Sequence, residues 1–402
     1  MTPFPGLETR AARVLEYRER VRARRKLYFF FARTILLFLL AEAFWETGLS
    51  RVLAHGLRGW FSGSPVWPLT HIFFIAFSIF AYEIVLFPVS YFEDLLSPGK
   101  GPDAGPAAAP AFGAWLLQWT LSLLIETILV TAAGTAIYTL MWLQPNLWWL
   151  SATALYAAIF VGLSVWGPSI LLPRVKRMRP VQDPDLLGDL QRLGEKAGLR
   201  IQACVCWEID DPAPHSEVAD APLRNVVLAG VGRHRTVVFT ADFLHRHSRR
   251  EQLFLAARRM AGHKGGADVL AYAVQILLVG LMVWGASRWM TTFALQRGIS
   301  DPFQPEVFPV WVAILFVLAT LIGFPLHALK RHLALRCDTF ALTHAGGLPV
   351  LAESFRRQFE TAPFAYHATI WQIIFYDTPT PEDRLRHAKS LAARHGHSAC
   401  PK

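Results

Sequence analysis

The residues with the clearest chemical potential lie in one polar run, 249–266, which reads RREQLFLAARRMAGHKGG. Two histidines four residues apart on one face of a helix can hold zinc, and a glutamate after the first can activate a zinc-bound water. His263 can be the second histidine of such a motif, which places the first histidine at position 259 and the glutamate at position 260. Arg259 and Met260 stand where the first histidine and the glutamate would be. Arginine cannot ligate a cation and methionine cannot accept a proton from water, so this run is not expected to hydrolyse peptides.

The composition is typical of a polytopic membrane protein. Apolar residues make up 53% of the 402 and the mean hydropathy is +0.31, which argues against an ordinary soluble globule. A short apolar stretch, 51–61, contains His55 and Arg58 and is predicted to be an interfacial helix. The fold class we predict is mainly α, a polytopic helical membrane protein with about six transmembrane helices. The six apolar segments of spanning length are 27–49, 68–92, 113–141, 147–173, 268–291 and 305–327.

Basic residues gather on one side of these segments. The first 26 residues, the loop after the fourth segment and the chain after the sixth are rich in lysine and arginine, and the opposite loops are poorer. The positive-inside rule therefore predicts that both termini and the polar domain are cytoplasmic, in the cell inner (plasma) membrane. The net charge of +10 suits a surface that meets anionic membrane lipids. Nucleic acid is not expected as a partner, because no basic, aromatic-interleaved module accompanies this charge.

The segments divide the chain into five parts. Residues 1–26 are predicted to form a basic amphipathic helix on the membrane surface, with a solvated, positively charged leader as the alternative. Spans one to four occupy residues 27–173, with a flexible Pro/Gly/Ala linker at 97–112 between the second and the third. The polar domain occupies 174–267 and spans five and six occupy 268–328. A helical C-terminal part of the domain occupies 329–402. The polar domain is expected to have a helix and three strands before the run 249–266: 185–197, 200–209, 225–229 and 236–240.

Short motifs along the chain occur in the order found in a known family. They are FPVSY (87–91), GPSI (167–170), NVVLAG (225–230), TVVF (236–239), and FYDTP (375–379) followed by Arg384. Together they resemble the motifs of the type I CAAX prenyl proteases, integral-membrane zinc endopeptidases whose cytoplasm-facing active site opens into a chamber between the spans. The resemblance runs from the second span to Ala388. It implies a cytoplasmic, gluzincin-like α+β domain, with zinc as the cofactor of the family's active members.

The chain departs from that family where the family does its chemistry. Besides Arg259 and Met260, the position of the third zinc ligand is occupied by Ala334, although the aspartate four residues later is kept as Asp338. Thr378 replaces a histidine that helps to stabilise the oxyanion in the family. Two of three ligands, the general base and this helper are missing together. We therefore predict a catalytically inactive homologue, a pseudoprotease that binds no metal and keeps one vestigial histidine.

Such a homologue would bind a peptide or membrane-protein client or regulate a partner, and the sequence does not fix its oligomeric state. The candidate peptide-binding strand matches the substrate-pairing strand of the family: Asn225, Val226, Val227, Leu228 and Ala229. Pairing through the main chain needs an open sheet edge rather than a metal, so it can outlast catalysis. Two rival hypotheses are a zinc metalloendopeptidase of this type that uses unorthodox ligands, and a lipid or small-molecule carrier that uses an intramembrane chamber.

An ion pair is predicted at the vacated site. In the family, the aspartate matched by Asp338 orients the first histidine ligand, and that histidine is Arg259 here. An unpaired buried carboxylate is costly, and a guanidinium supplies both the missing charge and a fork of donors. We therefore predict that Arg259 pairs with Asp338. In the alternative, Arg259 reaches solvent and Asp338 caps a helix or pairs with Arg336.

Three carboxylates lie inside predicted spans: Glu42, Glu83 and Glu126. A charge at bilayer depth costs a few kcal/mol, so such residues normally face a partner or a watered cavity. Because the first three spans contribute one each, these are candidate chamber carboxylates. The alternative is local pairing with Arg33 or His71.

Overall fold

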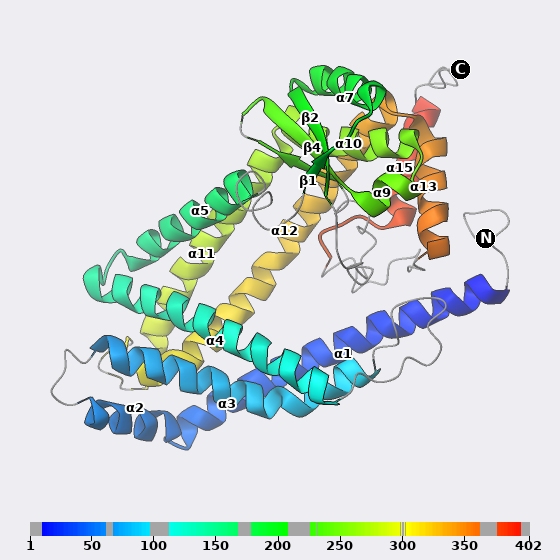
Figure 1. Cartoon of the computed structure of the whole chain (residues 1–402). Helices are drawn as coiled ribbons and strands as arrows, with labels where there is room; N and C mark the ends of the chain where they lie inside the picture. Colours follow the sequence, from blue (N-terminus) through cyan, green and yellow to red (C-terminus); the bar gives the residue numbers. More distant parts are fainter. Residues whose placement is uncertain are drawn as a thin grey trace.

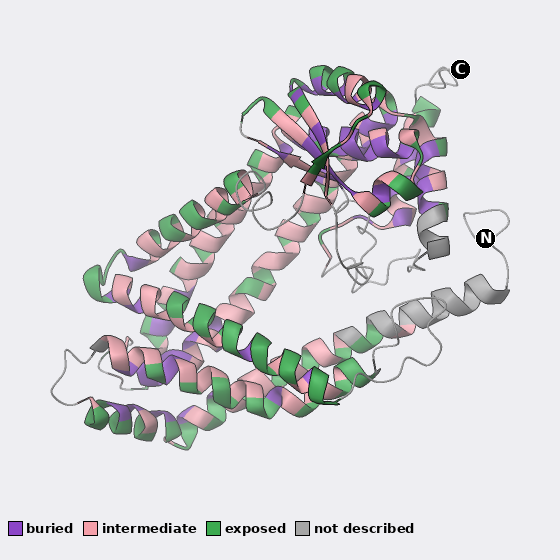
Figure 2. Ribbon diagram, in the orientation of Figure 1, coloured by how far each residue is buried: buried purple, intermediate pink, exposed green. Residues whose placement is uncertain are grey.

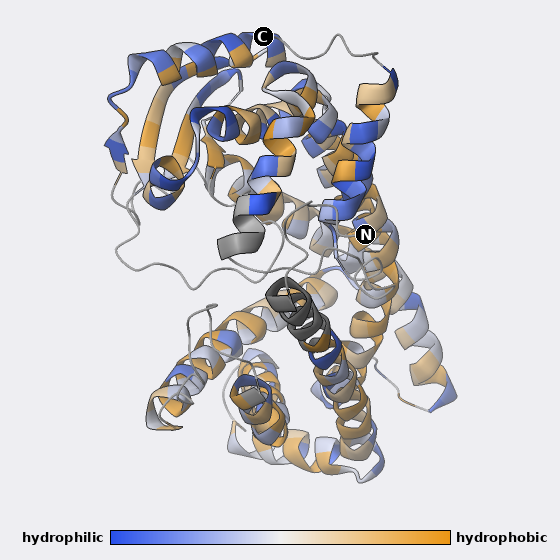
Figure 3. Cartoon of the chain, turned by 90° about the vertical axis from the view of Figure 1, so that its right-hand side faces the viewer, coloured by the Kyte–Doolittle hydropathy of each residue, from blue (hydrophilic) through white to orange (hydrophobic). Residues whose placement is uncertain are grey.

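The computed structural model describes residues 10–61, 67–96, 112–167, 178–207, 226–361 (except 231, 298, 300 and 302) and 376–394. Most of the predicted linker, Asn225 and residues 1–9 lie outside these ranges. The chain consists of long helices that lead to a small mixed domain at one end (Figure 1). Hydrophobic residues predominate along the long helices, and hydrophilic ones gather on the domain (Figure 3).

Six helices in the described chain are long and apolar enough to cross a membrane, which confirms the predicted number. They are α1 (Arg10–Glu46), α3 (Trp67–Leu96), α4 (Phe112–Leu143), α5 (Trp148–Trp166), α11 (Ala267–Gln296) and α12 (Phe308–His344). The apolar stretch after the first span forms the short helix α2 (Leu49–Trp60), and the 3-10 turn η2 (Pro305–Val307) leads into α12. Arg58 of α2 pairs with Glu306 of η2, with Nη2 2.9 Å from Oε1.

Two helices run through boundaries that we expected between parts of the chain. The basic N-terminal segment and the first span form the single helix α1. Similarly, α12 continues from the last span into the polar domain as far as His344. Helix α1 contains no glycine or proline that would end it at this boundary, whereas α12 continues although Gly323 and Pro325 lie just before its boundary. As a consequence, α12 carries Asp338 directly from the membrane region into the domain.

The polar domain has a four-stranded mixed sheet with the order β1–β2–β4–β3. Its strands are β1 (Met178–Pro180), β2 (Arg200–Trp207), β3 (Val226–Ala229) and β4 (His234–Thr240). The central pair β2–β4 is parallel and the outer pairs are antiparallel. The structure confirms the three predicted strands, and β1 is an additional strand of three residues. The predicted helix is α7 (Pro184–Ala197), which begins where Asp183 Oδ1 accepts a hydrogen bond from the backbone N–H of Leu186.

Four further helices complete the domain: α9 (Ala241–Arg246), α10 (Arg249–Lys264), α13 (Gly347–Thr361) and α15 (Pro381–Arg394). Helix α10 contacts α7, α12, α13 and β3, so it lies at the centre of the domain. Buried residues concentrate around it (Figure 2). The apolar core there is formed by α7, the sheet, α10, α12, α13 and α15 together. The polar run singled out in the sequence is therefore a core helix.

Candidate functional site

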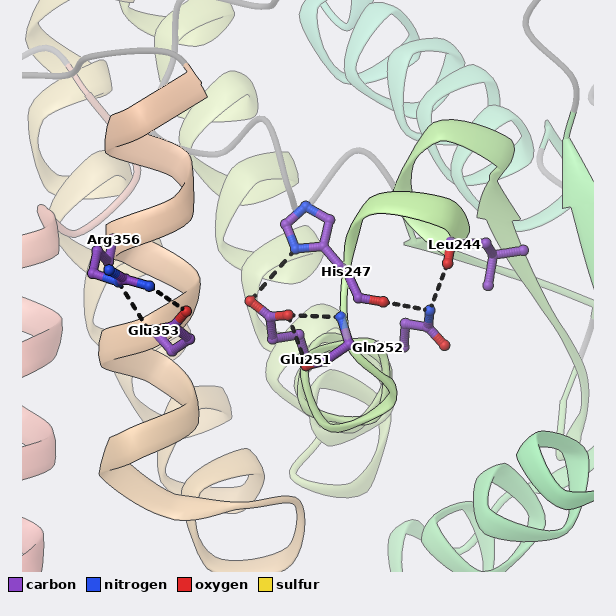
Figure 4. Close-up of polar contacts among 7 residues, drawn as sticks. Leu244, His247, Glu251, Gln252, Glu353 and Arg356 are labelled. Atoms are coloured by element: carbon purple, nitrogen blue, oxygen red, sulfur yellow. Dashed lines mark hydrogen bonds and ion pairs between the residues drawn. The ribbon is translucent and has the colours of Figure 1, made fainter.

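The start of α10 is fixed by a capping box. Glu251 accepts hydrogen bonds from the backbone N–H and the hydroxyl of Ser248, at 2.8 and 2.7 Å, and His247 Nδ1 lies 3.6 Å from its other oxygen (Figure 4). Gln252 donates to the carbonyls of Leu244 and His247, both at 2.9 Å. Burial alone would raise the pKa of Glu251, but its contacts with His247 and Ser248 lower the pKa to about 2. Glu251 is thus an ionised structural carboxylate that holds α10 against α9.

Arg259 and Met260 of α10 are built into the fold in different ways. Met260 is fully buried in the apolar core of the domain. Arg259 points to the sheet, where its Nε donates to the carbonyl of Val226 on β3 over 3.2 Å. One turn further along the same face, His263 Nδ1 lies 3.8 Å from Asp268 Oδ2. Burial lowers the pKa of His263. The charge of Asp268 acts in the opposite direction and raises this pKa, whereas the charge of Arg235 lowers it further. This face of α10 therefore carries one arginine and one imidazole.

A buried ion cluster lies on another face of α10. Arg258 Nε is 2.6 Å from Asp338 Oδ1, and Arg384 Nε of α15 is 3.7 Å from Oδ2. The three side chains are 6%, 0% and 5% exposed, so solvent screens them little. Neither oxygen of Asp338 accepts a hydrogen bond from a described residue, so the attraction in the cluster is between charges.

We predicted Arg259 as the guanidinium on Asp338, and the structure gives that contact to its neighbour Arg258. Successive side chains point about 100° apart around a helix, so the two arginines cannot share one direction. Arg258 faces α12 and α15, whereas Arg259 faces β3. The buried carboxylate with a guanidinium partner is present, but its partner is displaced by one residue. The alternative partner Arg336 is exposed on α12.

The residues at the family's zinc positions do not fit a zinc ion. Arg259, Met260 and Ala334 supply no metal donor, and His263 alone falls short of the three protein ligands that a catalytic zinc needs. Across the described residues, no group of three or more His, Cys, Asp or Glu side chains lies close enough to hold a metal. His247, which lies just before α10, packs against Phe243 in a tilted contact with ring centroids 4.4 Å apart.

The candidate peptide-binding strand lies at one edge of the described sheet. β3 pairs with β4 on one side, with Val226 opposite Phe239 and Ala229 opposite Thr236. Val226 and Ala229 are buried, whereas Val227 and Leu228 are partly exposed. The guanidinium of Arg259 contacts the strand at Val226. Asn225 lies outside the described residues. Peptide pairing at this edge stays a prediction.

Two of the three candidate chamber carboxylates line one cavity among the membrane helices. Glu83 of α3, Glu126 of α4 and Arg33 of α1 border a space of about 370 Å³. The ion-pair partner of Arg33 is Glu93, with Nη2 2.8 Å from Oε2. The cavity also has aromatic walls at Trp115 and Trp119, whose rings stack. Glu42 is exposed on α1 and is not among the described lining residues.

Six long apolar helices and a small mixed sheet define a polytopic helical membrane protein. The structure is similar to the crystal structure of Ste24p from S. mikatae, with a TM-score of 0.68 and 14% sequence identity. The match covers 96% of this chain and 92% of that chain. It supports the resemblance to the CAAX prenyl proteases at the level of the fold. No protein-family model and no curated protein match the sequence.

Sequence reasoning missed Arg258, the nearer cation of the ion cluster. The signal was present, because α10 places two consecutive arginines between apolar residues that are themselves buried. Such a pair cannot be entirely at the surface. The contact of Arg259 with the Val226 carbonyl was also missed, because the distance between α10 and β3 depends on the packing of the whole domain.

Proposed function

We propose that this chain is a catalytically inactive membrane metallopeptidase homologue that binds an extended peptide, or a segment of a membrane-protein client, along β3. The observation that carries the proposal is how Arg259 and Met260 contact the rest of the domain. Met260 is fully buried in the domain core, and Arg259 is bonded to the edge strand. Met260, at the position of the general base, thus packs in the core, and Arg259, at the position of a zinc ligand, binds the edge strand.

The edge of a sheet offers main-chain donors and acceptors to an added strand. β3 has such an edge on the side away from β4. A guanidinium beside it favours a client that presents a carbonyl or carboxylate oxygen near Val226. A role in regulating a partner would use the same surface, since it requires only that the partner offers an extended segment. We propose the plasma membrane as the location, with the domain cytoplasmic, from the asymmetry of basic residues.

A carrier of a lipid or small molecule is the second candidate. The cavity lined by Arg33, Glu83 and Glu126 supports it, because charged groups that line a space inside the membrane mark pathways and ligand sites. The peptide-binding proposal is preferred because the likeness to Ste24p covers nearly the whole chain and includes the domain. The rival peptidase requires ligands that the positions of α10 and α12 do not supply.

The decisive experiment combines elemental analysis, a peptidase assay and crosslinking on the purified full chain. A photo-crosslinking residue at Leu228 should capture added extended peptides in the wild type. Val227→Pro should abolish capture, because proline removes a backbone donor, while Val227→Thr should preserve it. About one zinc per chain that is lost with His263→Ala, together with hydrolysis, would instead establish the enzyme. Capture that survives Val227→Pro in a folded protein would move binding away from β3.

A further inference from the structure

A second cavity lies outside the protease-like site, between α12 and α15. Its volume is about 490 Å³. It is lined by two arginines, two histidines and a serine hydroxyl with a single carboxylate and two apolar residues: Arg331, His332, Arg386, His387, Ser390, Asp383, Leu335 and Pro379. The lining is thus dominated by groups that can donate hydrogen bonds to an anion.

The one carboxylate of this cavity is already satisfied locally. Asp383 accepts a hydrogen bond from the Thr380 hydroxyl over 2.8 Å, and its backbone N–H donates back to that oxygen over 3.2 Å. These bonds form the cap at the start of α15, so the role of Asp383 is structural. Arg386 Nη1 lies 3.9 Å from Asp383, and its Nη2 pairs with Glu382 over 2.6 Å.

Of the two basic residues that α12 contributes to the lining, neither has an ion-pair partner among the described residues. Arg331 Nη1 donates to the carbonyl of Tyr376 over 2.6 Å, which fixes the side chain while adding no negative charge. His332, the next residue, is exposed and has no hydrogen bond or ion pair to another described residue. His387 Nε2 contacts the Thr339 hydroxyl over 2.8 Å, which holds its ring at the cavity wall. An anion in this space would therefore meet prepositioned donors.

The position along α12 indicates where the anion comes from. Residues 308–326 contain no charged side chain, and at 1.5 Å per residue they extend about 28 Å, close to the thickness of a hydrocarbon core. The Arg58–Glu306 pair lies at one end of this apolar run, and Lys330 and Arg331 follow its other end. Arg331 is about 7 Å beyond the run, at the depth of lipid headgroups.

We propose that the cavity between α12 and α15 binds the phosphate of an anionic lipid headgroup. Basic pockets beside membrane helices bind phosphate-bearing headgroups through charge-assisted hydrogen bonds. Arg331 and Arg386 contact the phosphate oxygens, and His332 adds a donor at the exposed side. The bound lipid links α15 of the domain to the membrane through α12. This inference does not depend on the proposed peptide binding, because it uses no residue of α10 or β3.

The test measures binding of short-chain phosphatidic acid to the full chain in detergent, beside short-chain phosphatidylcholine and inorganic phosphate. Phosphatidic acid should bind about tenfold more tightly than phosphatidylcholine, because only its exposed monoester offers the extra charge to the arginines. Arg331→Gln combined with Arg386→Gln should weaken that binding about tenfold, the effect of losing bonds to a charged group. Lys389→Gln, an exposed position of α15 outside the lining, removes one positive charge as the matched control and should change it less than about twofold.

Each contrary result has a definite meaning. Equal binding of the two lipids, or unchanged binding of phosphatidic acid by the double variant, would overturn the site. Competition by inorganic phosphate at an equal concentration would make soluble phosphate the ligand and overturn the lipid assignment. If the double variant does not fold, His332→Gln decides, because this exposed side chain has no partner among the described residues. It should weaken binding severalfold, and unchanged affinity would then count against the proposal.

Discussion

The buried charges of the domain contact each other, whereas the carboxylates of the membrane cavity face a space. On α10 and α12, Arg258 and Asp338 are 6% and 0% exposed and lie against each other. On α3 and α4, Glu83 and Glu126 line an open space, and the nearby Arg33 pairs with Glu93. Charges that meet each other indicate structure, and charges that meet a cavity indicate a ligand or water. The charges of α10 belong to the first kind.

The largest expected effect on the free energy of unfolding comes from removing the carboxylate of the buried ion cluster in the domain. Asp338→Ala would leave two guanidinium groups buried beside an apolar core, which should destabilise the protein by ~3–5 kcal/mol. The measurement is the free energy of unfolding in detergent. Asp377→Ala serves as the control, because this exposed carboxylate pairs with Lys330 at 3.8 Å and should contribute less than about 1 kcal/mol. Adding Arg258→Met to Asp338→Ala should recover part of the loss; if Asp338→Ala alone is neutral, the cluster is not structural.

The next effect tests whether position 260 has become a packing position. Met260→Glu would place a carboxyl group in the fully buried core without a partner, and should cost about 2–4 kcal/mol. Met260→Leu keeps the volume and the apolar character, so it should cost less than about 1.5 kcal/mol. Thermal unfolding of the two variants gives the comparison. Equal stability of both would mean that the position still opens to water, as a catalytic base requires.

A smaller effect depends on pH through Glu251. Its contacts lower the pKa from 4.5 to about 2 in the folded protein. A carboxyl with a lowered folded-state pKa contributes stability above its unfolded pKa, and that contribution is lost as the pH falls toward the folded pKa. Stability should therefore decline between about pH 5 and pH 2 in the wild type, by about 2–3 kcal/mol from this group. Glu251→Gln should flatten this part of the profile; an identical slope in the variant would contradict the assignment.

The sequence predicts the membrane architecture well because hydrophobic length is a local property. The six spans, the α7 helix and the strands β2, β3 and β4 follow from segments that can be assessed one at a time. The partner of Asp338 could not be obtained this way, because Arg258 and Arg259 differ only in their direction around α10. The cavity between α12 and α15 joins residues about fifty positions apart, and only the tertiary fold brings them together.

The smallest expected effect tests the membrane side of the comparison. Glu83→Gln combined with Glu126→Gln should change the free energy of unfolding by less than about 1 kcal/mol, because neither carboxylate forms an ion pair with a described residue. Glu93→Gln is the contrasting variant, since it breaks the 2.8 Å contact with Arg33 and leaves that guanidinium beside the cavity. We expect the Glu93 variant to be the less stable of the two in parallel unfolding measurements. The reverse order would show that Glu83 and Glu126 hold the helices together. The cavity would then be a structural contact like the cluster at Asp338, and the carrier hypothesis would lose its support.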